Sequence, residues 1–491
     1  MSDSEAIEDH PGSDADVLAG LNRKTWRWSG VFSVANGAFA LAAGFATTIC
    51  AVALSHDKGS IFFHVNEIAG WFNGGAKPEV VTWPSWGYAW LIALLPSLGV
   101  LLVIQAGIGV VALTALSHRL RVALPQHRTS ISVLLILAVP WHAGQADFYP
   151  NALAGSFALI SILCLDRALA RSSFKAALAG GFAAGLSQNF RTEFVLIPLF
   201  VLIAMFALMR LKIMPRYQLR PVLVYVAFAL ALQIPWAMFY HAQTGRYSLT
   251  ESNLGHVLYV SLGSDPNNPW SITKDDLSAQ DAVRQGGFEF SSLSDDGSKF
   301  LLQIVKRDVR NNPAGFVKRT VYQLKNTLAV PFYWWEPRLG SDHRANLDIL
   351  REDLKNRIGV AANERQVALY KEQGVLSSAR RDTVAMLALG YQFATAGTGA
   401  LIFLLSLFGM AILVFRRGTR PTDPLLWLFG LVVLYKAFLD IVLNYGVEYL
   451  SNVYPLVIPF ACVALSRLRV HLGNLFRRVR GTRPDVLTFV E

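Results

Sequence analysis

Long apolar stretches alternate along this chain with short polar stretches that are rich in arginine. A membrane-spanning helix needs about 20 mostly apolar residues, and most of the stretches approach that length. The pattern predicts ten spans, at residues 30–54, 87–116, 129–142, 149–166, 176–190, 193–210, 220–240, 384–415, 424–443 and 449–466. We therefore expect an all-α integral membrane protein.

The third and fifth stretches are short, and the fifth, 176–190, is rich in alanine and glycine. Small residues let helices pack closely inside a bundle. The same two stretches would also suit a re-entrant pair, so the sequence leaves both arrangements open.

A long stretch of mixed charge separates the seventh predicted span from the eighth. Its parts at 299–309 and 316–328 show helical periodicity, so we expect a mainly helical segment outside the membrane. The predicted organisation is a disordered cytoplasmic leader at 1–28, a membrane block at 29–240 with an outer loop at 55–86, an extracytoplasmic segment at 241–383, a second membrane block at 384–466 and a basic cytoplasmic tail at 467–491.

Basic residues cluster on one side of the ten predicted spans. The clusters lie at 23–27, 119–128, 167–175, 210–220, 416–420 and 467–483. Because positively charged loops stay in the cytoplasm, we expect both termini on the cytoplasmic side of the cell inner (plasma) membrane. The net charge of +11 is dispersed over these clusters, which favours contact with anionic membrane lipid and argues against a nucleic-acid partner.

An acidic residue follows the first apolar stretch almost directly. Asp57 either ends that helix in water or acts as a general base, which would take a proton from an acceptor hydroxyl or amine. Aromatic residues follow at 62–63 and at 83–88 (WPSWGY). A carboxylate held beside aromatics at a membrane surface suits chemistry on a lipid-carried substrate.

A second acidic residue, Asp147, lies between the third and fourth predicted spans, close in sequence to His142 and Gln145. This polar cluster would orient an acceptor at the same membrane face or contribute to a metal site. One histidine and one aspartate are too few ligands for a metal. We therefore assign no cofactor and leave dependence on a divalent metal open.

Arg191 and Glu193 lie between two apolar stretches, on the side that otherwise carries little positive charge. One interpretation is an ion pair that stabilises a tight connection between helices. The other makes Arg191 a clamp for a lipid phosphate, because a guanidinium group matches phosphate oxygens with two parallel hydrogen bonds. Such a cation would stabilise a departing phosphate, and the cost of a charge near lipid favours a function.

Lys436 and Asp440 lie four residues apart in the ninth predicted span, so they share a helix face. Charged groups inside a span usually pair and face the protein interior. The two therefore form a structural ion pair or belong to a lipid-phosphate pocket. Glu448 and Tyr449 then return polar groups to the outer surface before the tenth span.

At these residues the chain resembles the GT-C superfamily. It is most similar to the family 39-type membrane glycosyltransferases, which are related to the protein mannosyltransferases and the lipid A aminoarabinose transferase. The likeness rests on Asp57, on Pro84, Gly87 and Tyr88 at the entry to the second span, on the turn Arg191-Thr192-Glu193, and on Glu448-Tyr449-Leu450 and Tyr454-Pro455 before the last span. The chain departs from the family pattern at Lys58, Thr192 and Glu448.

The resemblance implies the transfer of a sugar from a polyprenyl-phosphate carrier to a glycan, lipid or protein acceptor. It implies Asp57 as the catalytic base, and a single displacement would invert the anomeric carbon. The residues that we expect to bind substrate are Asp147, Arg191, Glu193, His142, Lys436, Asp440, Glu448 and Tyr449. Other functions stay open: a transporter or lipid flippase, a lipid-linked glycan ligase or polymerase, and an inactive membrane scaffold.

Overall fold

The structure is a computed structural model, and it describes most of the chain. The described residues are 28–31, 33–53, 59–83, 86–146, 150–210, 219–265, 267–329, 339–357, 364–415, 424–442, 454–465 and 468. Within these ranges the regular structure is entirely helical and contains no strand. The predicted all-α class is therefore confirmed for the described part of the chain.

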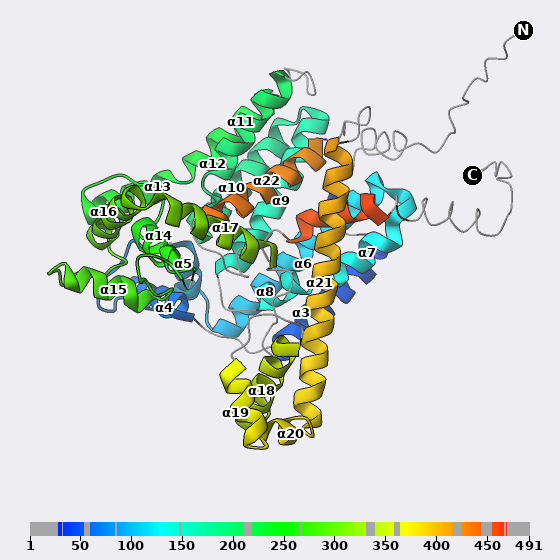
Figure 1. The fold of residues 1–491 in the computed structure, drawn as a ribbon. Helices are drawn as coiled ribbons and strands as arrows, with labels where there is room; N and C mark the ends of the chain where they lie inside the picture. The colour runs from blue at the N-terminus through cyan, green and yellow to red at the C-terminus, as the bar shows by residue number, and fades with distance from the viewer. Residues whose placement is uncertain are drawn as a thin grey trace, which may run out of the picture.

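The first half of the chain forms a bundle of closely packed helices, shown in blue to green in Figure 1. Its helices are α2 (Trp28–Val31), α3 (Val34–Ala53), α4 (Gly59–Phe72), α5 (Trp86–Leu94), α6 (Leu98–Ala123), η1 (Pro125–His127), α7 (Arg128–Ile136), α8 (Val139–Ala146), α9 (Pro150–Arg171), α10 (Phe174–Phe190), η2 (Thr192–Phe194), α11 (Ile197–Arg210), α12 (Leu219–Ala231) and α13 (Ile234–Thr244).

The second half adds the segment 241–383 and the last helices of the bundle. These helices are α14 (Leu254–Leu262), α15 (Asp276–Gln285), α16 (Asp295–Asn311), α17 (Pro313–Ala329), α18 (Ser341–Arg357), α19 (Glu364–Glu372), α20 (Val375–Ala379), α21 (Thr383–Phe415), α22 (Pro424–Val442) and η5 (Tyr454–Val457). The segment 241–383 is mainly helical, as its periodicity predicts.

Four helices among the described residues are long and apolar enough to cross a membrane. They are Leu98–Ala123, Pro150–Arg171, Leu219–Thr244 and Thr383–Ile412. Shorter apolar helices lie at Asn36–Ala51, Thr192–Phe206, Leu428–Leu439 and Tyr454–Leu465. These eight helices fall within or overlap eight of the ten predicted spans, and the count of ten stays a prediction.

Helix α9 lies at the centre of the bundle and is buried along most of its length. It packs against α6, α10, α12 and α22. Glycines explain the closeness of α10: a Cβ atom at Gly180 would lie 3.2 Å from the Ser161 carbonyl oxygen, and one at Gly181 only 2.6 Å from that of Tyr225. Because α10 is a 17-residue helix that packs against α9 and α12, the small-residue stretch forms a closely packed helix of the bundle.

The contacts between helices define two ends of the bundle. Arg119 of α6 pairs with Asp166 of α9, and Arg121 of α6 donates to Asn36 near the start of α3. We call this end, which also holds Arg171, the basic end. The opposite end, where the segment 241–383 joins the bundle after Thr244 and before Thr383, is the segment end.

Three predicted elements differ from the structure. The second span is divided between α5 and α6, because Pro96 cannot continue a helix and the Ser97 side chain caps α6 by accepting from the Val100 amide. The stretch 55–86, predicted as a loop, contains the helix α4. The third span is likewise divided, into α7 and α8.

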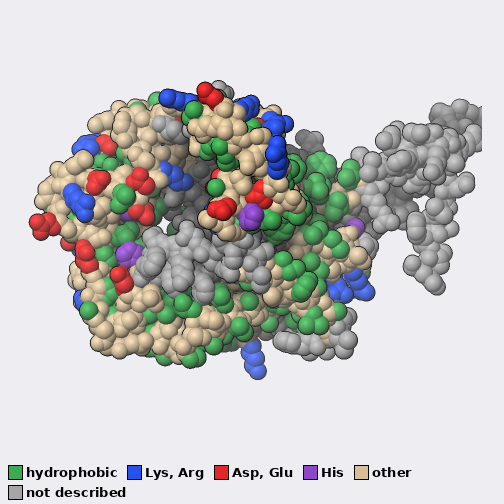
Figure 2. All heavy atoms as spheres, turned by 90° about the horizontal axis from the view of Figure 1, so that it is seen from below, with side chains coloured by type: hydrophobic (Ala, Val, Ile, Leu, Met, Phe, Trp, Pro, Cys, Tyr) green, Lys and Arg blue, Asp and Glu red, His purple; other side chains and the backbone are tan. Residues whose placement is uncertain are grey.

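The segment 241–383 forms two small helical units at the segment end. In one, α14, α15 and α16 share a core of Val260, Ala279, Val283 and Leu301. In the other, which we call the α18–α20 cap, Leu347, Leu350, Leu376 and Ala379 pack against Ala385 and Ala388 of α21. Figure 1 shows α21 extending past the bundle to reach this cap. Figure 2, a view from below, shows acidic and basic side chains interspersed over this face.

Candidate functional site

Three of the predicted site residues meet at the segment end. Helix α10 ends at Phe190, and Arg191 takes an extended conformation (φ −149°, ψ 114°) that turns the chain into η2. Glu193 lies in η2, with one carboxylate oxygen 3.4 Å from an Arg191 guanidinium nitrogen and the other 2.8 Å from Nζ of Lys436 in α22. We call Arg191, Glu193 and Lys436 the ionic cluster.

The ionic cluster is buried within the protein. The Lys436 side chain is 0% exposed, and those of Arg191 and Glu193 are 9% and 12% exposed. Removing charges from water is costly unless they are paired in good geometry, and here one carboxylate serves two cations. The Lys436 ammonium also lies 5.0 Å from the centre of the Phe194 ring, within range of a cation–π contact.

Lys436 has a partner that its position in the sequence does not indicate. The four-residue spacing favours Asp440, whereas the structure pairs Lys436 with Glu193, which is far away in sequence. The neighbouring Tyr435 hydroxyl donates to the backbone carbonyl of Glu193, so α22 contacts η2 through two consecutive residues. The side chain of Asp440 lies outside the described residues.

The start of α5 lies beside the ionic cluster. The indole nitrogen of Trp86 donates to the Asn189 side-chain oxygen at 3.0 Å, two residues before Arg191. At Gly87 an added Cβ atom would lie 2.5 Å from the Asn189 carbonyl oxygen, so only glycine allows this approach. These two contacts hold the stretch Trp86-Gly87-Tyr88, which the sequence analysis connects with the site, against the last turn of α10 just before Arg191.

Aromatic side chains surround the start of α5 at the segment end. Trp86 stacks on Phe239 of α13 with ring centres 5.9 Å apart and packs edge-on against Trp90. The connected rings are Trp71, Phe72, Trp86, Trp90, Trp236, Phe239 and Tyr240. Clustered tryptophan and tyrosine are typical of a membrane–water interface.

His142 belongs to a separate buried network. Its Nδ1 atom lies 2.9 Å from the Thr47 hydroxyl of α3, and its Nε2 atom lies 3.2 Å from the Leu135 carbonyl oxygen. Gln145, one turn later, donates to the Ala152 carbonyl of α9. This network fixes α8 between α3 and α9. Among the described residues, no group of three or more His, Cys, Asp or Glu side chains is arranged to hold a metal ion.

Four predicted site residues, Asp57, Asp147, Glu448 and Tyr449, lie outside the described residues. The residues that flank two of them are described: α3 ends at Ala53 and α4 begins at Gly59, while α8 ends at Ala146 and α9 begins at Pro150. The start of α3 lies beside the end of α6 at the basic end, because Asn36 contacts His118 and Arg121. The last part of α9 lies there too, because Asp166 pairs with Arg119. Ala53, at the end of α3, and Pro150, at the start of α9, therefore belong to the segment end.

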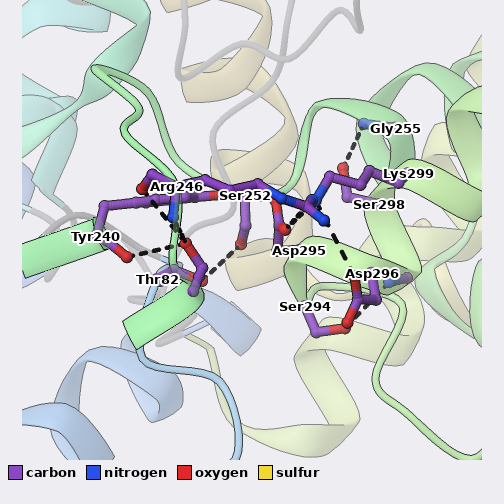
Figure 3. Close-up of polar contacts among 12 residues, drawn as sticks. Thr82, Tyr240, Arg246, Ser252, Gly255, Ser294, Asp295, Asp296, Ser298 and Lys299 are labelled. Atoms are coloured by element: carbon purple, nitrogen blue, oxygen red, sulfur yellow. Dashed lines mark hydrogen bonds and ion pairs between the residues drawn. The ribbon is translucent and has the colours of Figure 1, made fainter. Parts of the chain in front are cut away.

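A network of charged and polar side chains fixes the segment 241–383 to the bundle (Figure 3). Asp295, at the start of α16, accepts from the Tyr240 hydroxyl at 2.8 Å and from Arg246 at 2.9 Å, and it pairs with Lys299. Thr82, from the stretch before α5, donates to Ser252 at 3.1 Å. The position of α16 is therefore determined by the end of α13 and by residues before α5.

His256 contacts other residues of the segment 241–383. Its two ring nitrogens lie 3.0 Å from an Asp276 carboxylate oxygen and 3.1 Å from the Ser292 hydroxyl. The hydrogen bond from His256 lowers the pKa of Asp276. A carboxylate, an imidazole and a hydroxyl connected in this way resemble a catalytic triad. Ser292 is only 3% exposed, however, so these contacts hold α14, α15 and the stretch before α16 together.

Comparisons with known proteins do not add to these observations: no family model, curated protein or solved structure matches this chain. The site is therefore defined by its own geometry. It consists of two buried cations held by one carboxylate, beside an aromatic cluster, at the end of the bundle where the long segment attaches.

Proposed function

We propose that this chain is an integral-membrane glycosyltransferase that moves a sugar from a polyprenyl-phosphate carrier to an acceptor outside the cytoplasm. The observation that carries the proposal is the ionic cluster, in which the chain keeps Arg191, Glu193 and Lys436 buried together. Such a cluster is costly in a membrane protein and marks functional sites.

Arg191 and Lys436 are suited to bind the carrier phosphate. A guanidinium group offers two parallel donors to phosphate oxygens, and an ammonium group adds a compact charge. Glu193 holds both cations in place, as its distances of 3.4 Å and 2.8 Å to them indicate. Cations fixed before the reaction stabilise the charge that develops on a departing phosphate.

The aromatic cluster supports the same assignment of the site. Trp86, Trp90 and Phe239 lie at the same end of the bundle as Arg191. Interfacial aromatics mark the depth at which a lipid phosphate resides. We infer ten spans, a location in the inner membrane and cytoplasmic termini, so that the segment end faces away from the cytoplasm.

Asp57 is the proposed catalytic base, and the assignment rests on the family resemblance. It would take the proton of an acceptor hydroxyl or amine as that group attacks the anomeric carbon. The bond to phosphate breaks in the same step, the phosphate leaves as an anion toward Arg191 and Lys436, and the anomeric centre is inverted.

The test compares Asp57→Asn with Glu67→Gln, a matched control in the nearby helix α4, where Glu67 is 60% exposed. Purified variants are given polyprenyl-phosphate sugars and membrane extract as the acceptor source, and products are identified by mass spectrometry. General-base catalysis contributes roughly 10²–10⁴-fold, so Asp57→Asn should lose at least about 100-fold of the transfer rate while Glu67→Gln retains it. Full turnover by Asp57→Asn would contradict the assignment of the base. Transport of the lipid without a new glycosidic bond would favour a flippase.

A further inference from the structure

Two buried amide side chains near the ionic cluster make no hydrogen bond within the described structure. Asn151, at the start of α9, is 3% exposed, and Gln188, in the last turn of α10, is 1% exposed. Neither the nitrogen nor the oxygen of either amide has a hydrogen-bond partner among the described residues. Buried polar groups are nearly always paired, and an exception in a native fold requires an explanation.

The fold places both amides near the end of α10, which Arg191 follows directly. Gln188 lies in the last turn of α10 and precedes Arg191 by three residues in the chain. The Ser187 hydroxyl donates to the Ala154 carbonyl and fixes the antiparallel pairing of α10 with α9. Three residues further toward the segment end on both helices, Asn151 of α9 is level with Phe190, the last residue of α10.

Two other amides in the same region, one part-buried and one buried, are paired. Asn189 donates to the Gly185 and Leu232 carbonyls, and Gln233 donates to the Gly185 carbonyl. These contacts bind α10 to the α12–α13 connection. Amides that connect helices are thus hydrogen-bonded, whereas Asn151 and Gln188 have no hydrogen-bond partner among the described residues.

The chemistry of the unpaired atoms indicates the kind of ligand. Each amide offers both donors and an acceptor. A phosphate group that has lost its protons can only accept, so it would leave both amide oxygens unpaired. A hydroxyl group donates and accepts, and a sugar carries several hydroxyl groups on adjacent carbons.

We propose that Asn151 and Gln188 bind the hydroxyl groups of the sugar on the donor, beside the phosphate held by Arg191 and Lys436. The inference rests on the proposed function and adds the residues that recognise the sugar. It assigns sugar selectivity to the α9–α10 pair, separately from the base and from the cations.

The experiment uses the apolar variants Asn151→Leu and Gln188→Met, with Asn189→Leu and Gln233→Met as matched controls that lose a structural hydrogen bond. The first readout is the midpoint of thermal unfolding in detergent. Replacing an unpaired buried amide by an apolar group removes a cost. The first two variants should therefore unfold at the same or a higher temperature than the wild type, and the controls at a lower one.

The second readout is binding of two probes: polyprenyl monophosphate, and the same lipid phosphate carrying a hexose or a pentose. We expect Asn151→Leu and Gln188→Met to bind the sugar-bearing lipid at least about tenfold more weakly, while their affinity for the bare lipid phosphate is unchanged. The advantage of the sugar-bearing lipid over the bare lipid should disappear.

Each contrary result has its own meaning. If the variants are as stable as the wild type and still prefer the sugar-bearing lipid, the amides hold only water and the inference is wrong. If they lose as much stability as the controls, the amides have a structural role and the inference is wrong. If the wild type itself binds neither probe, the proposed function fails, and the inference fails with it.

Discussion

Lys436 and Glu193 illustrate how a few buried charges connect distant parts of this chain. The two residues come from α22 and η2, which are separated by the whole segment 241–383. Their ion pair, with the adjacent Tyr435 hydrogen bond, fixes the last helices of the bundle against the first half. Lys436, which we assign to phosphate binding, and Glu193, which holds it in place, therefore also support the fold.

Replacing Lys436 by methionine tests this structural role. The change leaves Glu193 buried with a single cation, and breaking a buried ion pair from one side costs about 3–5 kcal/mol. We expect a correspondingly lower free energy of unfolding in detergent, measured by chemical denaturation. The double variant Glu193→Gln/Lys436→Met should recover part of the loss, because its carboxylate is gone. A double variant that is less stable than Lys436→Met would argue against the pair.

The Asp276–His256 contact predicts a dependence of stability on pH. The folded pKa of Asp276 lies below its unfolded value, which is about 3.9. The stabilisation is therefore complete above the unfolded pKa and is lost as the pH falls through the folded pKa. The thermal midpoint of the wild type should exceed that of Asp276→Asn at pH 6, and the difference should shrink toward pH 3. A difference that grows on acidification would contradict this assignment.

The sequence alone indicates some of these residues and not others. Arg191, Glu193 and Lys436 are recognisable because a charge within an apolar stretch is unusual. Their mutual pairing is not recognisable from the sequence. Helix spacing indicates only neighbours on the same helix, such as Asp440 for Lys436, and gives no information about a distant residue such as Glu193. Asn151 and Gln188 give no signal in the sequence, because a buried amide becomes notable only when its partners are known.

At the scale of the helices, glycine decides how closely neighbours approach. Two of the glycines in α21 have contrasting surroundings. A Cβ atom at Gly409 would lie 1.9 Å from the Phe460 carbonyl oxygen, whereas one at Gly397 would meet nothing within 4 Å. The hydroxyl of Ser406, one turn before Gly409, donates to the Val457 carbonyl. The second half of α21 is therefore packed tightly against the chain that follows η5.

This contrast predicts opposite effects of the same substitution on one helix. Gly409→Ala should destabilise the protein by about 1–3 kcal/mol, because the added methyl group pushes the two segments apart. Gly397→Ala should leave stability unchanged or raise it by up to about 1 kcal/mol, since alanine is the better helix former. Thermal unfolding of the purified variants compares the two. Equal effects would mean that α21 does not pack in this way.

The elements themselves are largely predictable, and the errors have physical causes. Apolar length correctly locates eight apolar helices, four of which are long enough to cross a membrane. Pro96 interrupts the second span without interrupting its hydropathy, so the division between α5 and α6 is not apparent from apolar length. Helix α4 is missed because its composition suits an aromatic loop equally well, and only packing against α5 distinguishes the two.

At the scale of the whole molecule, Arg119, Arg121 and Arg171 of the basic end lie at the opposite end of the bundle from the segment 241–383. If basic loops face the cytoplasm, Arg171 and Asp281 lie on opposite sides of the membrane. The native residues Cys50, Cys164 and Cys462 are buried, so introduced cysteines can report on the two sides.

The labelling prediction uses Asp281→Cys in α15, where the side chain is 61% exposed, and Arg171→Cys at the end of α9, which is exposed. A membrane-impermeant thiol reagent should label the first variant in cells whose inner membrane is intact, and the second only after permeabilisation. The unmodified protein is the control for background labelling. Labelling of Arg171→Cys alone in intact cells would reverse the proposed orientation.

The length of α21 has a mechanical consequence. Its 33 residues form one continuous helix, about 50 Å long at 1.5 Å per residue, and the α18–α20 cap is packed on its first turns. A rigid rod of that length amplifies rotation: a tilt of about 10° around the Phe415 end displaces the Thr383 end by roughly 9 Å. A small change in the tilt of α21 at the basic end would therefore displace the cap by nearly the width of a helix.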